Sequence, residues 1–298
     1  MPRAQETGPY LPLTGATLRR MADVRVGISG WTYPGWRGDF FPEGLVHREE
    51  LRYAAEHVTS IEINGSFYAL QKPSSYAKWR DETPDDFVFA VKGGRYITHV
   101  RRLLDVETPL ANFFASGVLA LRGKLGPILW QLPPNMHFDA ERLDEFLDLL
   151  PETTAAACAL AARRDDKLPD DRVLAVTDAE RPIRHALEVR HASFAVPETM
   201  SIARNHGVAL VLADTAGRYP RIDEQTTDFR YARLHGDAEL YASGYTDAAL
   251  DDWAARVRGW STEGQDVFVY FDNDMKGRAP FDAMALLHRL GEDRRSMR

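Results

Sequence analysis

Cysteine and long apolar runs are both scarce in this chain of 298 residues. Cys158 is its single cysteine, so no disulfide can form within the chain, and we expect a reducing compartment such as the cytoplasm. No stretch reaches the roughly 18 apolar residues that cross a bilayer. Residues 1–22 have no apolar segment of the kind that a signal peptide needs. We therefore interpret them as a flexible, disordered N-terminal extension and expect no membrane contact.

An excess of positive charge is also missing, because 44 acidic residues outnumber 37 lysines and arginines and give a formal net charge of −7. A protein that tracks a phosphate backbone needs a basic face. Nucleic acid is therefore not the expected partner. The net charge does not rule out a local basic patch, so binding of nucleic acid stays an alternative. Neither a G-x-G-x-x-G nor a Walker sequence occurs, so we predict no redox or other cofactor.

Apolar stretches alternate with amphipathic stretches along the whole chain. Strands are predicted at residues 24–31, 60–64, 86–92, 127–131, 185–190, 207–214, 229–236 and 266–273. Helical periodicity covers residues 47–57, 74–80, 109–121, 140–150, 197–206, 247–260 and 280–290. Eight short strands that alternate with helices predict an α/β fold, a (β/α)8 TIM-type barrel, rather than a doubly wound sheet. We assign residues 23–293 to this one domain, with an insertion at residues 151–184 before the fifth strand.

The fifth strand carries an unusual pair of charges. Glu188 and Arg190 point to one face of the strand, while Leu187 and Val189 point to the other. Buried charges are unfavourable unless they pair or bind a ligand. In a TIM-type barrel the C-terminal strand ends form the site, so polar residues at those ends should converge on one rim. They are Glu62, Asn64, Lys92, Gln131, Glu188, Arg190, Asp214, Arg233, His235 and Asn273.

Seven short blocks resemble the YecE-like family, which is catalogued as domain of unknown function 72. They are GISGWTYPGW at 27–36, IEINGSFY at 61–68, FAVK at 89–92 with ITH at 97–99, QLPP at 131–134, EVRH at 188–191, RLHG at 233–236 and YFDN at 270–273. The similarity extends over residues 24–290 and implies a TIM-type barrel with a polar pocket at the strand C-termini. It implies no reaction, because the activity of the family is not established. Many relatives have asparagine where this chain has Asp272, so we give Asn273 the greater weight.

The charged strand ends allow several kinds of chemistry. Glu62 and Glu188 would lie nearly opposite each other in the ring, so they could act as acid and base if their pKa values differ. Flanking cations could instead hold both in structural ion pairs. Lys92 could be an amine nucleophile in Schiff-base chemistry, but a charge that holds an anionic substrate is the favoured role. His235 is a candidate catalyst because it shares a face with Arg233.

A divalent metal site is a lesser alternative. Glu62, Glu188, Asp214 and His235 are ligand types that suit such ions. Cations at the same mouth argue against a metal, and no tight spacing such as H-x-x-x-H occurs. We therefore assign no metal ligands.

The remaining candidates would bind substrate. Gly236, Lys276 and Arg278 follow the last two strands, where barrels often seat an anion on a helix N-terminus. Aromatic residues of the loops suit sugars or nucleobases, but they could simply cover the mouth. The other predicted substrate contacts are Trp31, Tyr33, Tyr68 and His99.

Together these features predict an enzyme that acts by acid-base chemistry on a small anionic or hydroxyl-rich metabolite, such as a sugar phosphate or a nucleotide-like compound. A hydrolase, a lyase or an isomerase would each fit. One alternative is a barrel that binds a ligand or single-stranded nucleic acid without catalysis, and another is a metal-dependent isomerase or hydrolase. The substrate, the reaction type and the oligomeric state are not determined by the sequence.

Overall fold

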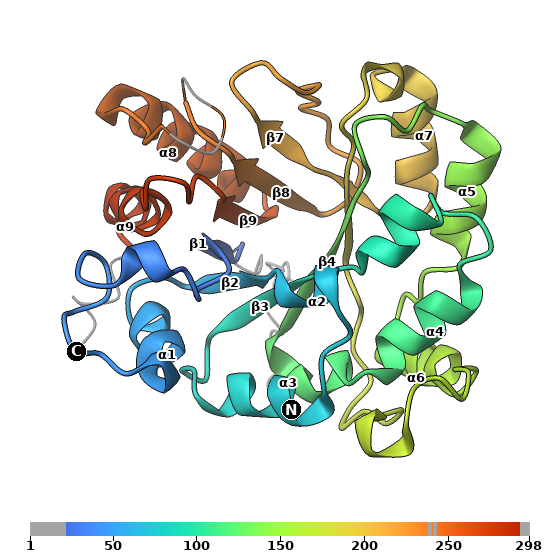
Figure 1. Cartoon of the computed structure of the whole chain (residues 1–298). Coiled ribbons are helices and arrows are strands. Elements are labelled where there is room, and N and C mark those ends of the chain that lie inside the picture. Colours follow the sequence, from blue (N-terminus) through green and yellow to red (C-terminus); the bar gives the residue numbers. More distant parts are fainter. Residues whose placement is uncertain (1–21, 238–239, 241–242, 293–298) are drawn as a thin grey trace, which may run out of the picture.

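Nine short parallel strands lie at the centre of the molecule, with helices around them (Figure 1). This computed structural model describes residues 22–292 apart from 238–239 and 241–242. The predicted N-terminal extension, except residue 22, lies outside the described residues. No helix within the described part of the chain is both long and apolar enough to cross a membrane.

The strands form a closed ring, as predicted for a (β/α)8 TIM-type barrel. They are β1 (Val24–Ser29), β2 (Ser60–Ile63), β3 (Val88–Lys92), β4 (Leu125–Gln131), β5 (His185–Glu188), β6 (Ala209–Leu210), β7 (Leu212–Asp214), β8 (Phe229–Leu234) and β9 (Asp266–Phe271). Strands β6 and β7 are two halves of the single strand predicted at residues 207–214. Val211 separates the two halves and belongs to neither. Its N–H still donates to the carbonyl of Leu187 in β5, at 2.9 Å. Each half pairs with a different neighbour, β5 or β8, so the ring of eight is complete.

Helices connect the strands and cover the outside of the ring (Figure 1). They are α1 (Glu50–Ala55), α2 (Gly65–Tyr68), α3 (Pro73–Asp81), α4 (Glu107–Ala115), α5 (Ala140–Asp148), α6 (Thr154–Ala161), α7 (Pro197–Asn205), α8 (Asp247–Thr262) and α9 (Ala279–Leu290). Local sequence explains several starts. Asp139, Thr153 and Thr246 each accept a backbone N–H as the N-cap of α5, α6 and α8, which satisfies a donor that the helix leaves unpaired. Helix α6 lies within the predicted insertion.

One helix boundary differs from the prediction. The sequence predicts a helix over residues 109–121, whereas α4 ends at Ala115 and a separate 3-10 segment, Val118–Lys124, follows. Gly117 lies between them with φ of 108°, in the left-handed region that ends helices. A Cβ at Gly117 would lie 2.5 Å from the Pro73 Cα, so this close approach to α3 also requires glycine.

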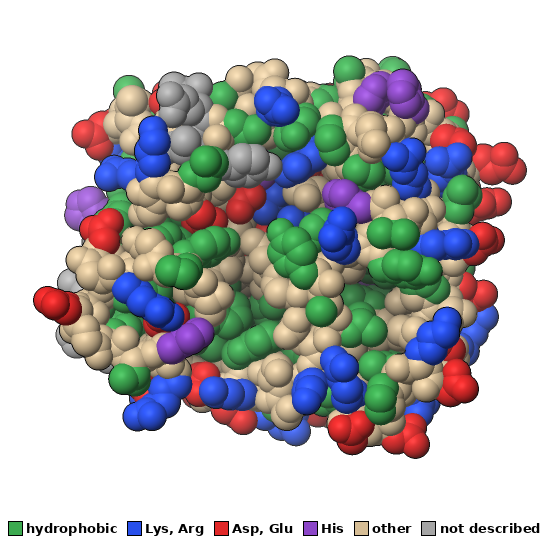
Figure 2. Space-filling model, viewed as in Figure 1, with side chains coloured by type: hydrophobic (Ala, Val, Ile, Leu, Met, Phe, Trp, Pro, Cys, Tyr) green, Lys and Arg blue, Asp and Glu red, His purple; other side chains and the backbone are tan. Residues whose placement is uncertain are grey.

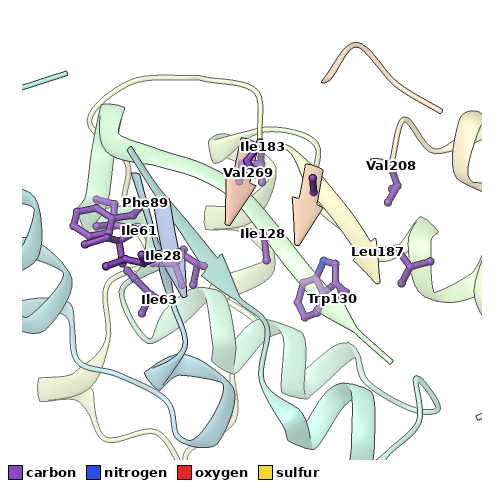
Figure 3. Close-up of a cluster of buried hydrophobic side chains, with 14 of the residues drawn as sticks. Ile28, Ile61, Ile63, Phe89, Ile128, Trp130, Ile183, Leu187, Val208 and Val269 are labelled. Atoms are coloured by element: carbon purple, nitrogen blue, oxygen red, sulfur yellow. The ribbon is translucent and has the colours of Figure 1, made fainter. Parts of the chain in front are cut away.

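Two apolar layers follow from the alternation of side chains along each strand. Outward residues pack between the ring and the helices, and Ile28, Ile61, Phe89, Ile128 and Leu187 show this arrangement (Figure 3). The inward residues form a second cluster, the barrel interior, made of Ala90, Leu129, Ala186, Ala209, Val211, Ala213, Phe229, Tyr231, Phe268 and Tyr270. The interior is therefore filled at this level, and any site lies beyond it, toward the C-terminal ends of the strands.

Candidate functional site

A charged layer lies directly above the apolar interior. The same alternation that turns Tyr231 and Tyr270 inward also turns inward the residues two positions later, Arg233 and Asp272. Glu62 and Glu188 reach this layer from β2 and β5. Glu62, Glu188 and Arg233 are fully buried, with 0% of each exposed. We call the group formed by Glu62, Glu188, Arg233, His235 and Asp272 the buried cluster.

Arg233 is the centre of the buried cluster. Its Nε and Nη2 donate to the two oxygens of Glu62 at 3.1 and 2.9 Å. Nη1 donates to Glu188 Oε2 at 2.8 Å, and Nη2 donates to Asp272 Oδ2 at 2.9 Å. Burial opposes a charge at this position, but the carboxylates of Glu62, Asp272 and Glu188 outweigh it and raise the pKa of Arg233 well above its ordinary value. One guanidinium therefore holds three carboxylates.

Glu62 and Glu188 each have further donors. Glu62 accepts from the Tyr231 hydroxyl at 2.6 Å and from the Ser29 hydroxyl at 3.0 Å. Glu188 accepts from Arg190 Nε at 2.7 Å and from Gln131 Nε2 at 2.9 Å. These contacts occupy both oxygens of both side chains.

The pKa of Glu188 reflects this environment. Burial would raise the pKa of this carboxyl, but the charges of Arg190 and Arg233 prevail and hold it well below its ordinary value. Glu188 is therefore ionised at neutral pH. The geometry of the buried cluster matches the ion-pair alternative that the sequence left open for Glu62 and Glu188.

His235 completes the buried cluster from the end of β8. Its Nδ1 lies 3.0 Å from Asp272 Oδ2, and its Nε2 lies 3.8 Å from Glu188 Oε1. Burial opposes ionisation of Asp272, yet Arg233 and His235 hold its pKa below the ordinary value. Asp272 is thus an ionised carboxylate that also lines the cavity above the buried cluster.

A cavity of about 840 Å³ opens above this layer at the C-terminal mouth of the barrel. Eight of the predicted site residues line it: Trp31, Tyr33, Asn64, Tyr68, Lys92, His99, Gln131 and Arg190. Four of them, Asn64, Lys92, Gln131 and Arg190, belong to the ten strand-end residues that the sequence predicts to converge on one rim. Glu62, Glu188, Arg233 and His235 lie beneath the cavity and do not line it.

Lys92 is the most distinctive side chain of the cavity. It is 8% exposed, and its Nζ lies 4.5 Å from the centroid of the Phe67 ring. Within the described part of the chain, this ammonium has no hydrogen-bond or ion-pair partner, because Arg233 and Arg190 already hold the nearby carboxylates. Burial and the charge of Arg233 lower the pKa of Lys92 to about 8. At pH 7 this lysine still carries its charge most of the time and can bind an anion, and its lowered pKa makes it a more reactive amine than a lysine in water.

Two neighbours of Lys92 share the cavity wall. The His99 ring meets the edge of Phe67 at 5.1 Å between centroids. Burial and the charges of Lys92 and Arg190 lower the pKa of His99 to about 4, so this imidazole is neutral at pH 7. Arg190 is held by Glu188 and also lies over the Tyr219 ring at 4.8 Å.

Five predicted site residues lie away from this cavity. Asp214 follows the inward Ala213, so it points outward and accepts from the Tyr245 hydroxyl at 3.1 Å. Asn273 follows the inward-pointing Asp272 and donates to Ser243 and Asp282. A period of two along a strand puts neighbouring residues on opposite faces.

The three predicted anion ligands occupy a separate region. Gly236 N–H meets the Tyr245 hydroxyl at 3.3 Å, Lys276 is exposed, and Arg278 lies 4.0 Å from Asp282. None of them lines the cavity. Their role as anion ligands stays a prediction.

Sequence reasoning also missed residues that the structure places at the site. Arg95 and Asp272 line the cavity. Asp274 lies next to Tyr33, and burial together with the charge of Asp272 raises its pKa well above the ordinary value. Counting two positions on from the inward Tyr270 would have identified Asp272, whereas Arg95 and Asp274 lie in loops that have no such periodicity. Among the residues that the structure describes, no group of three or more His, Cys, Asp or Glu side chains is placed to hold a metal ion.

A closed eight-stranded ring with a charged cavity at its C-terminal mouth defines a TIM-type barrel with one candidate site. Residues 25–298 match the family model described as protein of unknown function DUF72, and the chain belongs to this family. The resemblance inferred from the sequence blocks is therefore confirmed.

Two curated proteins and one solved structure illustrate what the chain is similar to. UPF0759 protein YunF of Bacillus subtilis (strain 168) is 24% identical over 296 residues, which are 90% of this chain and 94% of that protein. UPF0759 protein YecE of Escherichia coli (strain K12) is 31% identical over 129 residues, which are 43% and 44% of the two chains. The crystal structure of a DUF72 family protein from Thermotoga maritima MSB8 superposes with a TM-score of 0.71 at 26% identity, and the match covers 91% of this chain and 100% of that one.

Proposed function

We propose that this protein is an enzyme that acts by acid-base chemistry on a small anionic or hydroxyl-rich metabolite, such as a sugar phosphate or a nucleotide-like compound. The charge of the cavity carries the proposal. Lys92, Arg95 and Arg190 line it, and Asp272 is the single acidic residue among the described residues of the lining. A positive cavity in a chain of net charge −7 attracts anions selectively. The single cysteine favours the cytoplasm as the place of this activity.

The cavity also offers groups for a substrate's hydroxyls and apolar face. Asn64 has a buried Oδ1 with no hydrogen-bond partner among the described residues, so it is ready to accept a hydroxyl hydrogen. Trp31 and Phe67 present aromatic surface, which suits a sugar or a base. These features match a ligand that is both anionic and rich in hydroxyls.

Proton transfer is best assigned to groups that reach the cavity. Asp272, which is ionised, and His99, which is neutral at pH 7, both reach the cavity in the form that accepts a proton. Glu62 and Glu188 are buried and fully occupied by donors, so we now give them a positioning role in place of direct catalysis. His235 lies beside Asp272 and would orient it.

The alternative of a nucleic-acid-binding barrel has less support. On the face shown in Figure 2, basic and acidic side chains are interspersed and form no continuous basic stripe. Tyr68 is 72% exposed at the cavity, so stacking of a single base remains an outcome of the test rather than a second proposal.

The test is a thermal-shift screen of the full chain against sugar phosphates, nucleotides and single-stranded oligonucleotides, followed by NMR detection of turnover for each hit. Arg95→Met and Arg190→Met should abolish the ligand-induced rise in Tm. Arg204→Met is the matched control, because Arg204 lies on α7 in an exposed ion pair with Glu224 at 3.0 Å, and it should leave the rise unchanged. His99→Gln should retain binding and lower turnover. The proposal would be refuted if only oligonucleotides raised the Tm and if this rise persisted in both Arg95→Met and Arg190→Met.

A further inference from the structure

The Lys92 amine is the one feature of the cavity that anion binding alone does not explain. A lysine that only holds an anion works best when it is fully protonated. Here the side chain is buried, faces an aromatic ring, and has no counter-ion within 4.0 Å among the described residues. Three carboxylates lie in the layer below, but the arginines hold them.

We infer that Lys92 is a covalent nucleophile and that the substrate is a carbonyl compound bearing a carboxylate or phosphate group, which forms an imine with Nζ. This inference rests on the proposed function, because it assigns a reaction to the same cavity. The anionic group would lie against Arg190 and Arg95, which line the cavity with Lys92. Burial and the charge of Arg233 support the neutral amine, since they lower the pKa of Lys92 to about 8.

The covalent step needs only the substrate and proton transfers. The lone pair of the neutral Nζ forms a bond to the carbonyl carbon, and the C=O π pair moves to oxygen, which takes a proton. The nitrogen loses one proton to give the carbinolamine. A second proton on that hydroxyl lets it leave as water while the nitrogen lone pair forms the C=N bond, which gives the protonated imine with the remaining hydrogen on nitrogen. His99 and Asp272 line the same cavity and can carry these protons.

The backbone around Lys92 is held firmly enough to position a nucleophile. The Ser66 hydroxyl donates to the Lys92 carbonyl at 2.7 Å. The next residue, Gly93, donates its N–H to the Leu129 carbonyl at 2.8 Å, and a Cβ on it would lie 2.3 Å from the Trp130 ring. Lys92 therefore sits on a rigid strand end, as a catalytic group requires.

Reductive trapping tests the imine. The full chain is incubated at pH 7 with glyoxylate in one arm and glycolaldehyde phosphate in the other, each with cyanoborohydride, which reduces an imine to a stable secondary amine. Trypsin does not cleave after a modified lysine, so trapping at Lys92 yields a peptide of residues 81–95 with the added mass in place of residues 81–92. Lys78, which is 58% exposed on α3, is the internal control. We expect Lys92 to react at least about tenfold faster than Lys78 in the arm whose anion fits the cavity.

The variants separate this inference from the proposed function. Lys92→Arg keeps the positive charge, so it should retain anion-induced stabilisation by inorganic phosphate or malonate while forming no adduct at position 92. One outcome would overturn the imine inference and leave the proposed function standing: phosphate or malonate stabilises the chain, but Lys92 is labelled no faster than Lys78 in both arms. The absence of both effects would refute both.

Discussion

Replacing Arg233 with methionine would remove the positive centre of the buried cluster while keeping a side chain of similar length. The carboxylates of Glu62, Glu188 and Asp272 would then lose the guanidinium that each contacts within about 3 Å. Removal of one partner from a buried ion pair costs about 3–5 kcal/mol. Arg190 stays on Glu188 and limits the loss, so we expect the free energy of unfolding to fall by about 3–5 kcal/mol, a large part of a typical total of about 5–15 kcal/mol.

The loss should depend on pH. In the native chain the pKa values of Glu188 and Asp272 are lowered. Their stabilisation is therefore present above the ordinary carboxyl pKa of about 4 and is lost as the pH falls below it. Without Arg233 the carboxyls should take up protons at higher pH, which relieves their repulsion. The difference in stability between the native chain and Arg233→Met should thus narrow from pH 7 to pH 5.

Urea unfolding followed by circular dichroism at pH 7 and pH 5 measures both effects. Arg204→Met, which breaks an exposed pair, should cost less than about 1 kcal/mol. If Arg233→Met does not fold, the double variant Arg233→Met/Glu62→Gln should restore soluble protein, because it removes one of the unpaired charges. A cost as small as that of Arg204→Met, or a cost that is equal at both pH values, would refute the view that Arg233 holds the site together.

Three further predictions concern the lysine, a histidine and two glycines. Lys92→Met should stabilise the chain at pH 7 by about 1–3 kcal/mol in urea unfolding. Folding disfavours the charged form of Lys92, because its pKa is about 8 in the folded chain against an ordinary value of 10.5. The gain in stability should therefore vanish above about pH 10, where the lysine is neutral in both states. A variant that is less stable than the native chain at pH 7 would contradict this. NMR titration should show the His99 ring taking up a proton near pH 4, because burial and the charges of Lys92 and Arg190 lower its pKa. The His99→Gln variant assigns the signal. A midpoint near pH 6.5 would contradict the view that the cavity disfavours a further positive charge on His99. Gly27→Ala should lower the melting temperature sharply, because its Cβ would lie 1.8 Å from the Ser60 carbonyl oxygen. Gly259→Ala, on an open face of α8, should leave the melting temperature unchanged or raise it.

The sequence was sufficient for the barrel because its signals are local. Apolar runs of strand length, each followed by a helical period, predicted every strand of the ring, and the interruption at Val211 divides one of them without changing the order. Alternation also predicted that Glu188 and Arg190 share a face, and they do, at 2.7 Å. The same rule, applied from Tyr231 and Tyr270, leads to Arg233 and Asp272. Asp214 and Asn273 are polar residues near strand ends, which made them site candidates. Each directly follows an inward-pointing residue, so both side chains point away from the cavity.

Only the tertiary structure decided which charges face the cavity and which neutralise one another beneath it. Arg233 contacts Glu62 across 171 positions of the chain, Glu188 across 45 and Asp272 across 39. No local period encodes these distances, because they depend on which strands lie opposite each other once the ring has closed. The energy of a charge depends on its nearest counter-charge and its access to water. The closed ring therefore determines that Glu62 and Glu188 are buried in ion pairs, while Lys92 faces the cavity with no counter-ion within 4.0 Å in the described part of the chain.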